Sequence, residues 1–158
     1  MDTLTPDFSA AILSGPHWMA VGITLLASGL TVGLHYEALE RMNWWLPRWK
    51  HVPPRLRILG LMVALLGLHI VEIWIFGIGI HMASHFPVLG EISGVTNIGL
   101  LDSIYLSATT YSTLGYGDLV PHGPIRFLLG TEALVGLLMI TWSASFTYLE
   151  MQNYWRTR

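Results

Sequence analysis

The chain has 158 residues, of which 53% are hydrophobic and only 11% are charged, and its formal net charge is -2 at pH 7. An average soluble domain has about 25% charged residues, so this composition indicates a membrane protein. The small negative charge excludes a nucleic-acid-binding surface of clustered Lys and Arg. The absence of cysteine excludes disulfides and thiolate chemistry, and the length fits one domain.

The first apolar stretch runs from about Pro16 to His35 and carries no formal charge. About 20 apolar residues are enough for a helix to cross the hydrocarbon core of a bilayer. The residues before it include Asp2 and Asp7 and no Lys or Arg, unlike the cationic start of a cleavable signal peptide. We therefore predict a transmembrane helix within an N-terminal region of residues 1–55.

Cationic residues gather after the first apolar stretch and at the end of the chain. They are Arg41, Arg48, Lys50, Arg55, Arg57, Arg156 and Arg158. Because cytoplasmic segments carry the excess of Lys and Arg, we expect the N-terminus outside and the C-terminus in the cytoplasm, across a plasma (inner) membrane. The linker NWWLPRWK, with Trp44, Trp45 and Trp49, is either an interfacial segment along the inner headgroups or an aromatic loop.

The second apolar stretch, Ile58 to Ile80, contains His69 and Glu72, and the third, Phe127 to Leu149, contains Glu132. Both stretches are long enough to cross a membrane. An ionisable group at membrane depth is costly unless protein or water supplies a partner. His69 lies one helical turn before Glu72, so we expect the two side chains to interact.

Both glutamates fall in the outer half of their spans when residues are counted from the membrane faces. In one interpretation they accept hydrogen bonds from Thr109, Thr110 or Ser112 and brace the segment that contains these hydroxyls. In a second interpretation a glutamate such as Glu132 senses pH. In a third, each makes a structural hydrogen bond without a regulatory role.

Between the second and third stretches, residues 102–112 form the short segment DSIYLSATTYS. Asp102 or Ser103 is a suitable N-cap for a helix. Eleven residues make a helix of roughly 16 Å, about half the thickness of the hydrocarbon core. Such a helix can enter the membrane without crossing it, so the chain has to turn back within protein or around water.

The turn is TLGYGD, residues 113–118. If Thr113, Leu114, Gly115, Tyr116 and Gly117 point successive carbonyl oxygens the same way, these oxygens can replace the water around an ion. Such a backbone needs left-handed or strained dihedral angles at alternate positions, which glycine accepts without a Cβ clash. The partly negative C-terminal end of the preceding half-helix favours a cation at the same place.

At these residues the chain resembles the pore-loop potassium channels, whose filter reads TVGYG. The resemblance covers roughly Leu56 to Asn153, and the filter TLGYG is followed by Asp118. The chain departs from the family at Leu114, where valine or isoleucine is usual, and at Thr109, where relatives often have an acidic or apolar residue beside the filter aspartate. The resemblance implies K⁺ ions at Thr113, Leu114, Gly115 and Tyr116, and no cofactor other than the transported ion.

The resemblance also implies an all-α membrane protein with three transmembrane helices per chain, a re-entrant pore helix and a filter loop. Four chains would surround one central pore as a homotetramer within membrane lipid. The pore domain, residues 56–158, would contain an outer helix over about 56–81, the pore helix over about 102–112, the filter over 113–118 and an inner helix over about 124–152. We expect Asp118 to support the filter.

In the third span, Gly136 is either a gating hinge or a point of close packing against the second span. Ser143, Ala144 and Ser145 are small enough to keep the lower pore open or to permit helix contact. In the loop beyond the filter, His122 is either a sensor of external pH or a solvated residue. His81 and His85 are spaced for a zinc site that would need a third ligand, Glu91 or His122.

Three other functions compete with a selective potassium channel. Leu114 leaves open a cation channel of weak selectivity. His69, Glu72 and Glu132 would be the metal ligands of an intramembrane hydrolase, a hypothesis that does not explain TLGYGD. A subunit of a larger potassium transporter usually repeats the pore loop within one chain, and this sequence shows no such repeat. We therefore predict a channel and not an enzyme.

Overall fold

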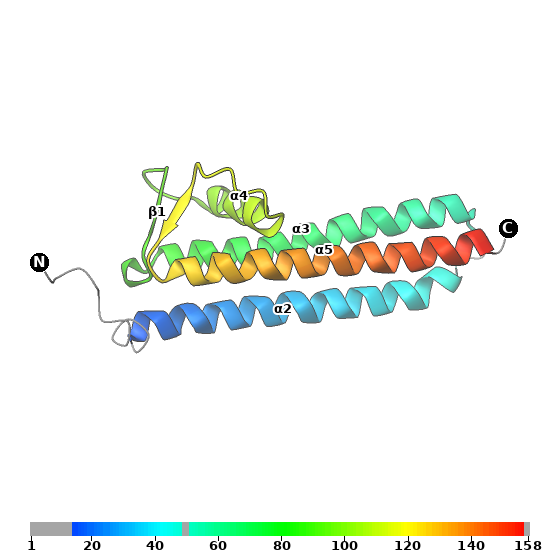
Figure 1. The fold of residues 1–158 in the computed structure, drawn as a ribbon, viewed down its shortest axis with the longest axis horizontal. Coiled ribbons are helices and arrows are strands. Elements are labelled where there is room, and N and C mark those ends of the chain that lie inside the picture. Colours follow the sequence, from blue (N-terminus) through cyan, green and yellow to red (C-terminus); the bar gives the residue numbers. More distant parts are fainter. Residues whose placement is uncertain (1–13, 49–50, 157–158) are drawn as a thin grey trace, which may run out of the picture.

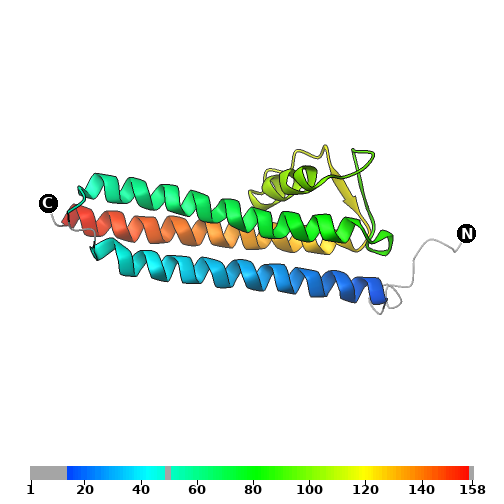
Figure 2. The ribbon, with the colours of Figure 1, turned by 180° about the vertical axis from the view of Figure 1, so that it is seen from behind.

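The computed structural model describes residues 14–48 and 51–156. Three long helices, α2 (Gly15–Trp45), α3 (Pro54–Ser84) and α5 (Ile125–Arg156), lie side by side along most of the molecule (Figure 1, Figure 2). Each contains a stretch long and apolar enough to cross a membrane. The chain is therefore an all-α multi-pass membrane protein, as its sequence predicts. Asp2, Asp7, Trp49, Lys50 and Arg158 lie outside the described residues.

A shorter helix, α4 (Leu100–Tyr111), packs against α3 and α5 near the end of the bundle where α2 begins (Figure 1). It lies along only part of the bundle, as expected for a helix that does not cross the membrane. Close approach to α3 is possible because Gly77 has no side chain, since a Cβ there would lie 2.9 Å from the Cα of Ile104. The N-cap of α4 is Gly99 and not Asp102 or Ser103.

The prediction of the α4 N-cap was wrong by one helical turn. Asp102 instead accepts a hydrogen bond from the backbone N–H of Gly99 across 2.9 Å, and the Ser103 hydroxyl donates to the Gly99 carbonyl oxygen across 3.0 Å. Both side chains thus point back to the residue that precedes the helix. An acidic group at this end also interacts favourably with the helix dipole.

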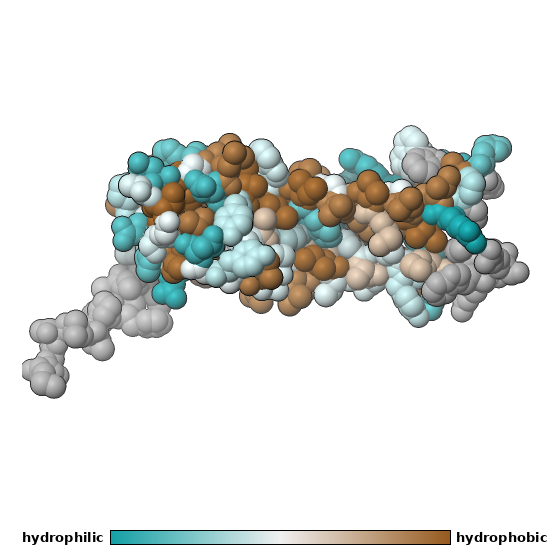
Figure 3. Space-filling model, turned by 90° about the horizontal axis from the view of Figure 1, so that it is seen from above, coloured by the Kyte–Doolittle hydropathy of each residue, from teal (hydrophilic) through white to brown (hydrophobic). Residues whose placement is uncertain are grey.

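One face of α2 is buried and carries mostly small side chains. Its buried residues are Ala20, Thr24, Ala27, Thr31, His35 and Leu39, spaced three or four apart as on one helix face. Small residues allow the backbones of membrane helices to approach closely. By contrast, large apolar side chains such as Leu25, Leu66 and Leu138 are exposed on the three long helices, and Figure 3 shows hydrophobic residues over much of one face.

Two short strands, not predicted from the sequence, join the segment before α4 to the segment after TLGYGD. β1 (Glu91–Ser93) pairs in antiparallel fashion with β2 (Val120–His122), with Glu91 opposite His122. Two 3-10 turns, η1 (Leu46–Arg48) and η2 (Pro87–Leu89), complete the described elements. The pairing holds these two segments together and limits how far the chain between them can move.

Candidate functional site

The loop after α4 contains TLGYGD, residues 113–118, the predicted filter, and has left-handed backbone at every second residue from Thr113 to Gly117. The φ angles of Thr113, Gly115 and Gly117 are 60°, 53° and 78°. Glycine adopts such angles at little cost, whereas a threonine in this region is uncommon and has to be held by its surroundings. The predicted conformations of Gly115 and Gly117 are therefore present, and Thr113 extends the same alternation by one step.

The C-terminal end of α4 continues directly into this loop through backbone hydrogen bonds. The Thr109 carbonyl oxygen accepts from the N–H groups of Leu114 and Gly115, at 2.8 and 3.0 Å, and the Thr113 N–H donates to the Thr110 carbonyl oxygen at 2.9 Å. Thr109 therefore contacts the filter through its main chain. These bonds fix the first filter residues to the rigid end of a helix.

The two large side chains of the filter point away from the rest of their own chain. Leu114 is 57% exposed and Tyr116 is 68% exposed. Elsewhere around the filter, a hollow is lined by Thr110, Gly115 and Gly117. The chain itself therefore leaves the Leu114 and Tyr116 side chains largely uncovered.

Asp118, the last residue of the motif, is held by a tyrosine of α4 that was not among the predicted site residues. The Tyr105 hydroxyl donates to Asp118 Oδ2 across 2.9 Å. The bond to the carboxylate raises the pKa of the Tyr105 phenol, so the phenol keeps its proton and remains a donor. The contact links the middle of α4 to the far end of the predicted filter. The Thr109 hydroxyl does not bond to Asp118 and donates to the Leu106 carbonyl oxygen instead.

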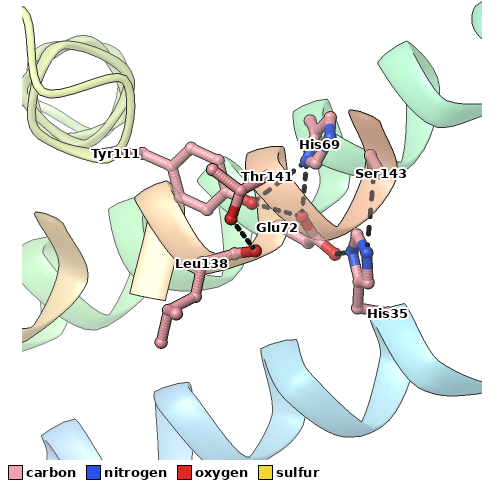
Figure 4. A network of polar contacts seen from close by, with 7 residues as sticks. All are labelled: His35, His69, Glu72, Tyr111, Leu138, Thr141 and Ser143. Carbon is pink, nitrogen blue, oxygen red and sulfur yellow. Dashed lines mark hydrogen bonds and ion pairs between the residues drawn. The ribbon is translucent and has the colours of Figure 1, made fainter. Parts of the chain in front are cut away.

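A buried polar network surrounds Glu72 (Figure 4). Glu72 Oε1 is 2.8 Å from His35 Nδ1, and Glu72 Oε2 is 2.9 Å from His69 Nδ1 and accepts the hydroxyl of Tyr111 across 2.5 Å. The His69 interaction was predicted from the sequence. The carboxylate can only accept, so both imidazoles and the phenol act as donors. One carboxylate thereby joins α2, α3 and the end of α4.

The sequence predicted hydrogen bonds from Thr109, Thr110 or Ser112 to the glutamates, but Thr109 and Ser112 bond elsewhere. The hydroxyls of Thr109 and Ser112 donate within α4, to the carbonyl oxygens of Leu106 and Ala108 at 2.9 and 2.7 Å. Short hydroxyl side chains in a helix readily bond to the preceding turn. The glutamates brace α4 through Tyr111 and Ser107 instead, and Tyr111 is the longer side chain that can reach α3.

Glu132, on α5, is fully buried. Ser107 Oγ is within hydrogen-bond distance of both Glu132 Oε1 and the Ile73 carbonyl oxygen, the latter at 2.8 Å. A serine hydroxyl has one hydrogen and the carbonyl oxygen can only accept. Both contacts are therefore satisfied when Glu132 carries a proton and donates it to Ser107.

Gly136 lies against the end of α4. A Cβ at Gly136 would be 2.1 Å from the carbonyl oxygen of Tyr111. Of the two interpretations of Gly136, close packing is thus observed, but the partner is α4 and not the second span. Because Gly136 has no side chain, the backbone of Tyr111, two residues before Thr113, lies directly against α5.

The small residues near the end of α5 divide between two faces. Ser143 is buried, and its Oγ lies 3.5 Å from His35 Nε2 on α2. Of the two interpretations of Ser143, helix contact is therefore the one observed. Ala144 and Ser145 are exposed.

The histidines outside the long spans make local contacts. His122 Nε2 is 3.0 Å from Ser93 Oγ on the neighbouring strand. The His122 side chain is also exposed, in agreement with the interpretation of a solvated residue. His85 Nδ1 donates to the His81 carbonyl oxygen across 2.8 Å. Within residues 14–48 and 51–156, these histidines belong to no group of three metal-ligating side chains.

One such group exists in the described part of the chain, and it consists of His35, His69 and Glu72. One ligand atom from each residue lies within 4.8 Å of the other two. The hydrolase hypothesis placed Glu132 in this set, but Glu132 bonds to Ser107 and is not a member. His35 was missed because it marked the end of the first span, although an ionisable group in an uncharged stretch was a signal.

Comparisons with known proteins find similarity over the part of the chain that contains α4 and the loop after it. A family model described as "Ion channel" matches residues 68–152, which include α4, the filter and most of α3 and α5. The two pore potassium channel a of Oryza sativa subsp. japonica is 31% identical over 80 residues, covering 51% of this chain and 20% of that protein. Protein LctB of Bacillus caldotenax is 50% identical over 40 residues, covering 25% of this chain and 30% of that protein. The chain thus spans less than a third of either relative, and no solved structure matches it.

Proposed function

The chain belongs to the ion channel family, and from this premise we propose that it is a potassium-selective channel. K⁺ passes passively down its gradient through rings of backbone carbonyl oxygens supplied by Thr113, Leu114, Gly115 and Tyr116, with Gly117 at the outer end. The oxygens replace the hydration shell of the ion. The protein works as a channel and not as an enzyme, and the proposal needs no cofactor beyond the transported ion.

The observation that carries this proposal is the alternation of left-handed φ angles at Thr113, Gly115 and Gly117. A regular strand turns successive carbonyl groups to opposite sides. Left-handed residues at every second position change this pattern and allow the carbonyl oxygens to share one side. The name of the rice relative, a potassium channel, supports the same ion, although the alignment covers only 20% of that protein.

We propose further that four chains form the pore. One chain supplies one filter strand, whereas a carbonyl cage around an ion needs several. The exposed side chains of Leu114 and Tyr116 support this assembly, since neighbouring chains would cover them. Helix α5 would line the inner vestibule, and native mass determination of the protein in detergent is expected to give four chains per particle.

The orientation follows from charge in the same proposal. Arg41, Arg48, Arg55 and Arg57 lie at the end of the bundle away from α4, which we place in the cytoplasm. The filter then opens to the outside of a plasma (inner) membrane, and the C-terminus is cytoplasmic. The guanidinium of Arg48 lies 3.2 Å from the centre of the Trp44 ring, a pairing suited to the headgroup region.

Ion flux into liposomes tests the proposal. Vesicles with purified protein and a K⁺ gradient are expected to develop a K⁺ diffusion potential, and a Na⁺ gradient is expected to give almost none. Gly115→Ala should abolish the K⁺ response, because φ of 53° strains any residue with a Cβ. Gly67→Ala, at an exposed helical position with open space around it, is the matched control and should behave like the wild type.

Equal responses to K⁺ and Na⁺ would contradict selectivity and would support a weakly selective cation channel. Leu114 is the residue that favours this second function, because it departs from the β-branched valine or isoleucine usual in the family. Leu114→Val would then restore discrimination between the two ions.

A further inference from the structure

We propose that His35, His69 and Glu72 form a binding site for a divalent transition metal ion such as Zn²⁺. The site lies between α2 and α3, close to the end of α4 (Figure 4). The ligand atoms are Nδ1 of His35, Nδ1 of His69 and a carboxylate oxygen of Glu72. This site is separate from the filter, and its ion is not the transported one.

The distances suit a small tetrahedral ion. The two imidazole nitrogens lie 2.8 and 2.9 Å from the oxygens of Glu72, and the three ligand atoms are all within 4.8 Å of one another. In a tetrahedral zinc site with bonds of about 2.0–2.1 Å, neighbouring ligand atoms are about 3.3 Å apart. The two nitrogen–oxygen pairs therefore need to lengthen by about half an ångström to admit the ion. The remaining pair, the two Nδ1 atoms, lies within 4.8 Å, so the imidazoles can reach a common ion through small side-chain rotations.

The ligand types select the class of metal. Imidazole nitrogen suits Zn²⁺, Co²⁺, Ni²⁺ and Cu²⁺, whereas Mg²⁺, Ca²⁺ and K⁺ prefer a shell of oxygens. Two imidazoles and one carboxylate also form the ligand set of several zinc sites. The Tyr111 hydroxyl, 3.1 Å from His69 Nδ1, is placed to supply the fourth ligand or to hold a water in that position.

The surroundings of the three residues favour the binding of a cation at this site. The side chains of His35 and Glu72 are completely buried, so the negative charge of the carboxylate lies in a low-dielectric region where a cation offsets it. The His69 side chain is 17% exposed and offers a way in. When Nδ1 of His35 binds metal, its proton resides on Nε2, and Ser143 Oγ lies 3.5 Å away as an acceptor.

Metal binding would replace the bonds that the two imidazoles donate to Glu72. It would thereby tie α2, which lies outside the residues matched by the family model, to Tyr111 two residues before the filter. An effect of zinc on ion flux rests on the proposed channel function. The existence of the metal site does not rest on the channel function, so metal binding is measured directly and without ion flux.

Co²⁺ provides the direct test, since its visible spectrum distinguishes tetrahedral from octahedral coordination. The purified wild-type protein in detergent, titrated with Co²⁺, is expected to show a tetrahedral spectrum that saturates at one ion per chain and is displaced by Zn²⁺. His35→Gln and His69→Gln should each weaken binding by more than about 100-fold, because even outer-shell partners are worth about 10- to 100-fold. His85→Gln is the control, since His85 and His81 form a surface pair that could bind metal by itself.

Three results would overturn the proposal. The first is a wild-type protein that shows no tetrahedral cobalt spectrum, which needs no variant to interpret. The second is retention of full affinity in His35→Gln and His69→Gln with unchanged particle size. The third is loss of the spectrum in His85→Gln, which would assign the metal to the surface pair.

Discussion

The hydroxyl of Tyr111 donates a hydrogen bond to the buried carboxylate of Glu72, and so joins the last residue of α4 to the middle of α3. The backbone of the same tyrosine packs against Gly136 of α5. Tyr111 is therefore fixed by its side chain on one helix and by its main chain on another, and Thr113, the first filter residue, follows two positions later. Its surroundings explain how a strained loop is held in one conformation.

Tyr111→Phe is expected to lower the free energy of unfolding by about 1.5–3 kcal/mol, because it removes a buried hydrogen bond to a charged group while keeping the ring. Thermal denaturation in detergent measures this loss. Tyr148→Phe is the control, since Tyr148 is exposed on α5. Equal stability of the two variants would show that the Tyr111 hydroxyl does not brace α4.

Gly136→Ala is expected to be more damaging than its size suggests. The added methyl group would meet the Tyr111 carbonyl oxygen at 2.1 Å, so α4 has to move away from α5. Overpacking typically costs about 1–3 kcal/mol and sometimes more, and here the displaced backbone adjoins the filter. We expect lower stability and loss of K⁺-selective flux in liposomes.

A matched substitution in another helix, Gly67→Ala, should leave both properties unchanged, because there is open space around that residue. If Gly136→Ala retained wild-type flux and stability, the close contact between α4 and α5 would not matter for the filter. A hinge role alone predicts altered opening with normal stability.

Tyr105→Phe tests the support at the other end of the filter. The variant removes the bond to Asp118, whose side chain is exposed in the chain, so we expect only a small loss of stability. Selectivity should suffer more than stability, because Asp118 ends the filter. The permeability ratio of K⁺ to Na⁺ should fall, and an unchanged ratio would remove Tyr105 from the filter support.

The two buried glutamates are expected to respond in opposite ways to replacement by glutamine. A glutamine at position 132 can donate to Ser107 as a protonated carboxyl does, so Glu132→Gln should change stability by less than about 1 kcal/mol. Glu72 accepts from three donors, and an amide N–H at this position would face them. Glu72→Gln should therefore destabilise by about 3 kcal/mol or more.

Chemical denaturation of both variants at neutral pH checks this contrast. Equal losses would mean that Glu132 is ionised like Glu72. A stable Glu72→Gln protein would mean that the network around Glu72 contributes little to the fold.

Much of the fold could be predicted because hydropathy and length alone separate a spanning helix from a half-helix. The spans around Pro16, Ile58 and Phe127 and the short helix before Thr113 follow from this rule, and the spacing of His69 and Glu72 predicts their contact. Local chemistry, namely the tolerance of glycine for left-handed angles, also predicts the backbone at Gly115 and Gly117.

Long-range contacts could not be predicted in the same way. His35 and Tyr111 meet Glu72 across 37 and 39 residues, a pairing that depends on how three helices dock. The strands β1 and β2 have three residues each, too few to show an alternating pattern. The packing partner of Gly136 was wrong because the sequence does not reveal which helix the re-entrant segment lies against.

The reversal potential of the purified protein in planar bilayers, with K⁺ on one side and Na⁺ on the other, tests potassium selectivity most directly. A carbonyl filter of the proposed kind predicts a reversal potential shifted to the K⁺ equilibrium value. A clear current that reverses near zero would contradict it and would identify a pore that does not distinguish the two ions.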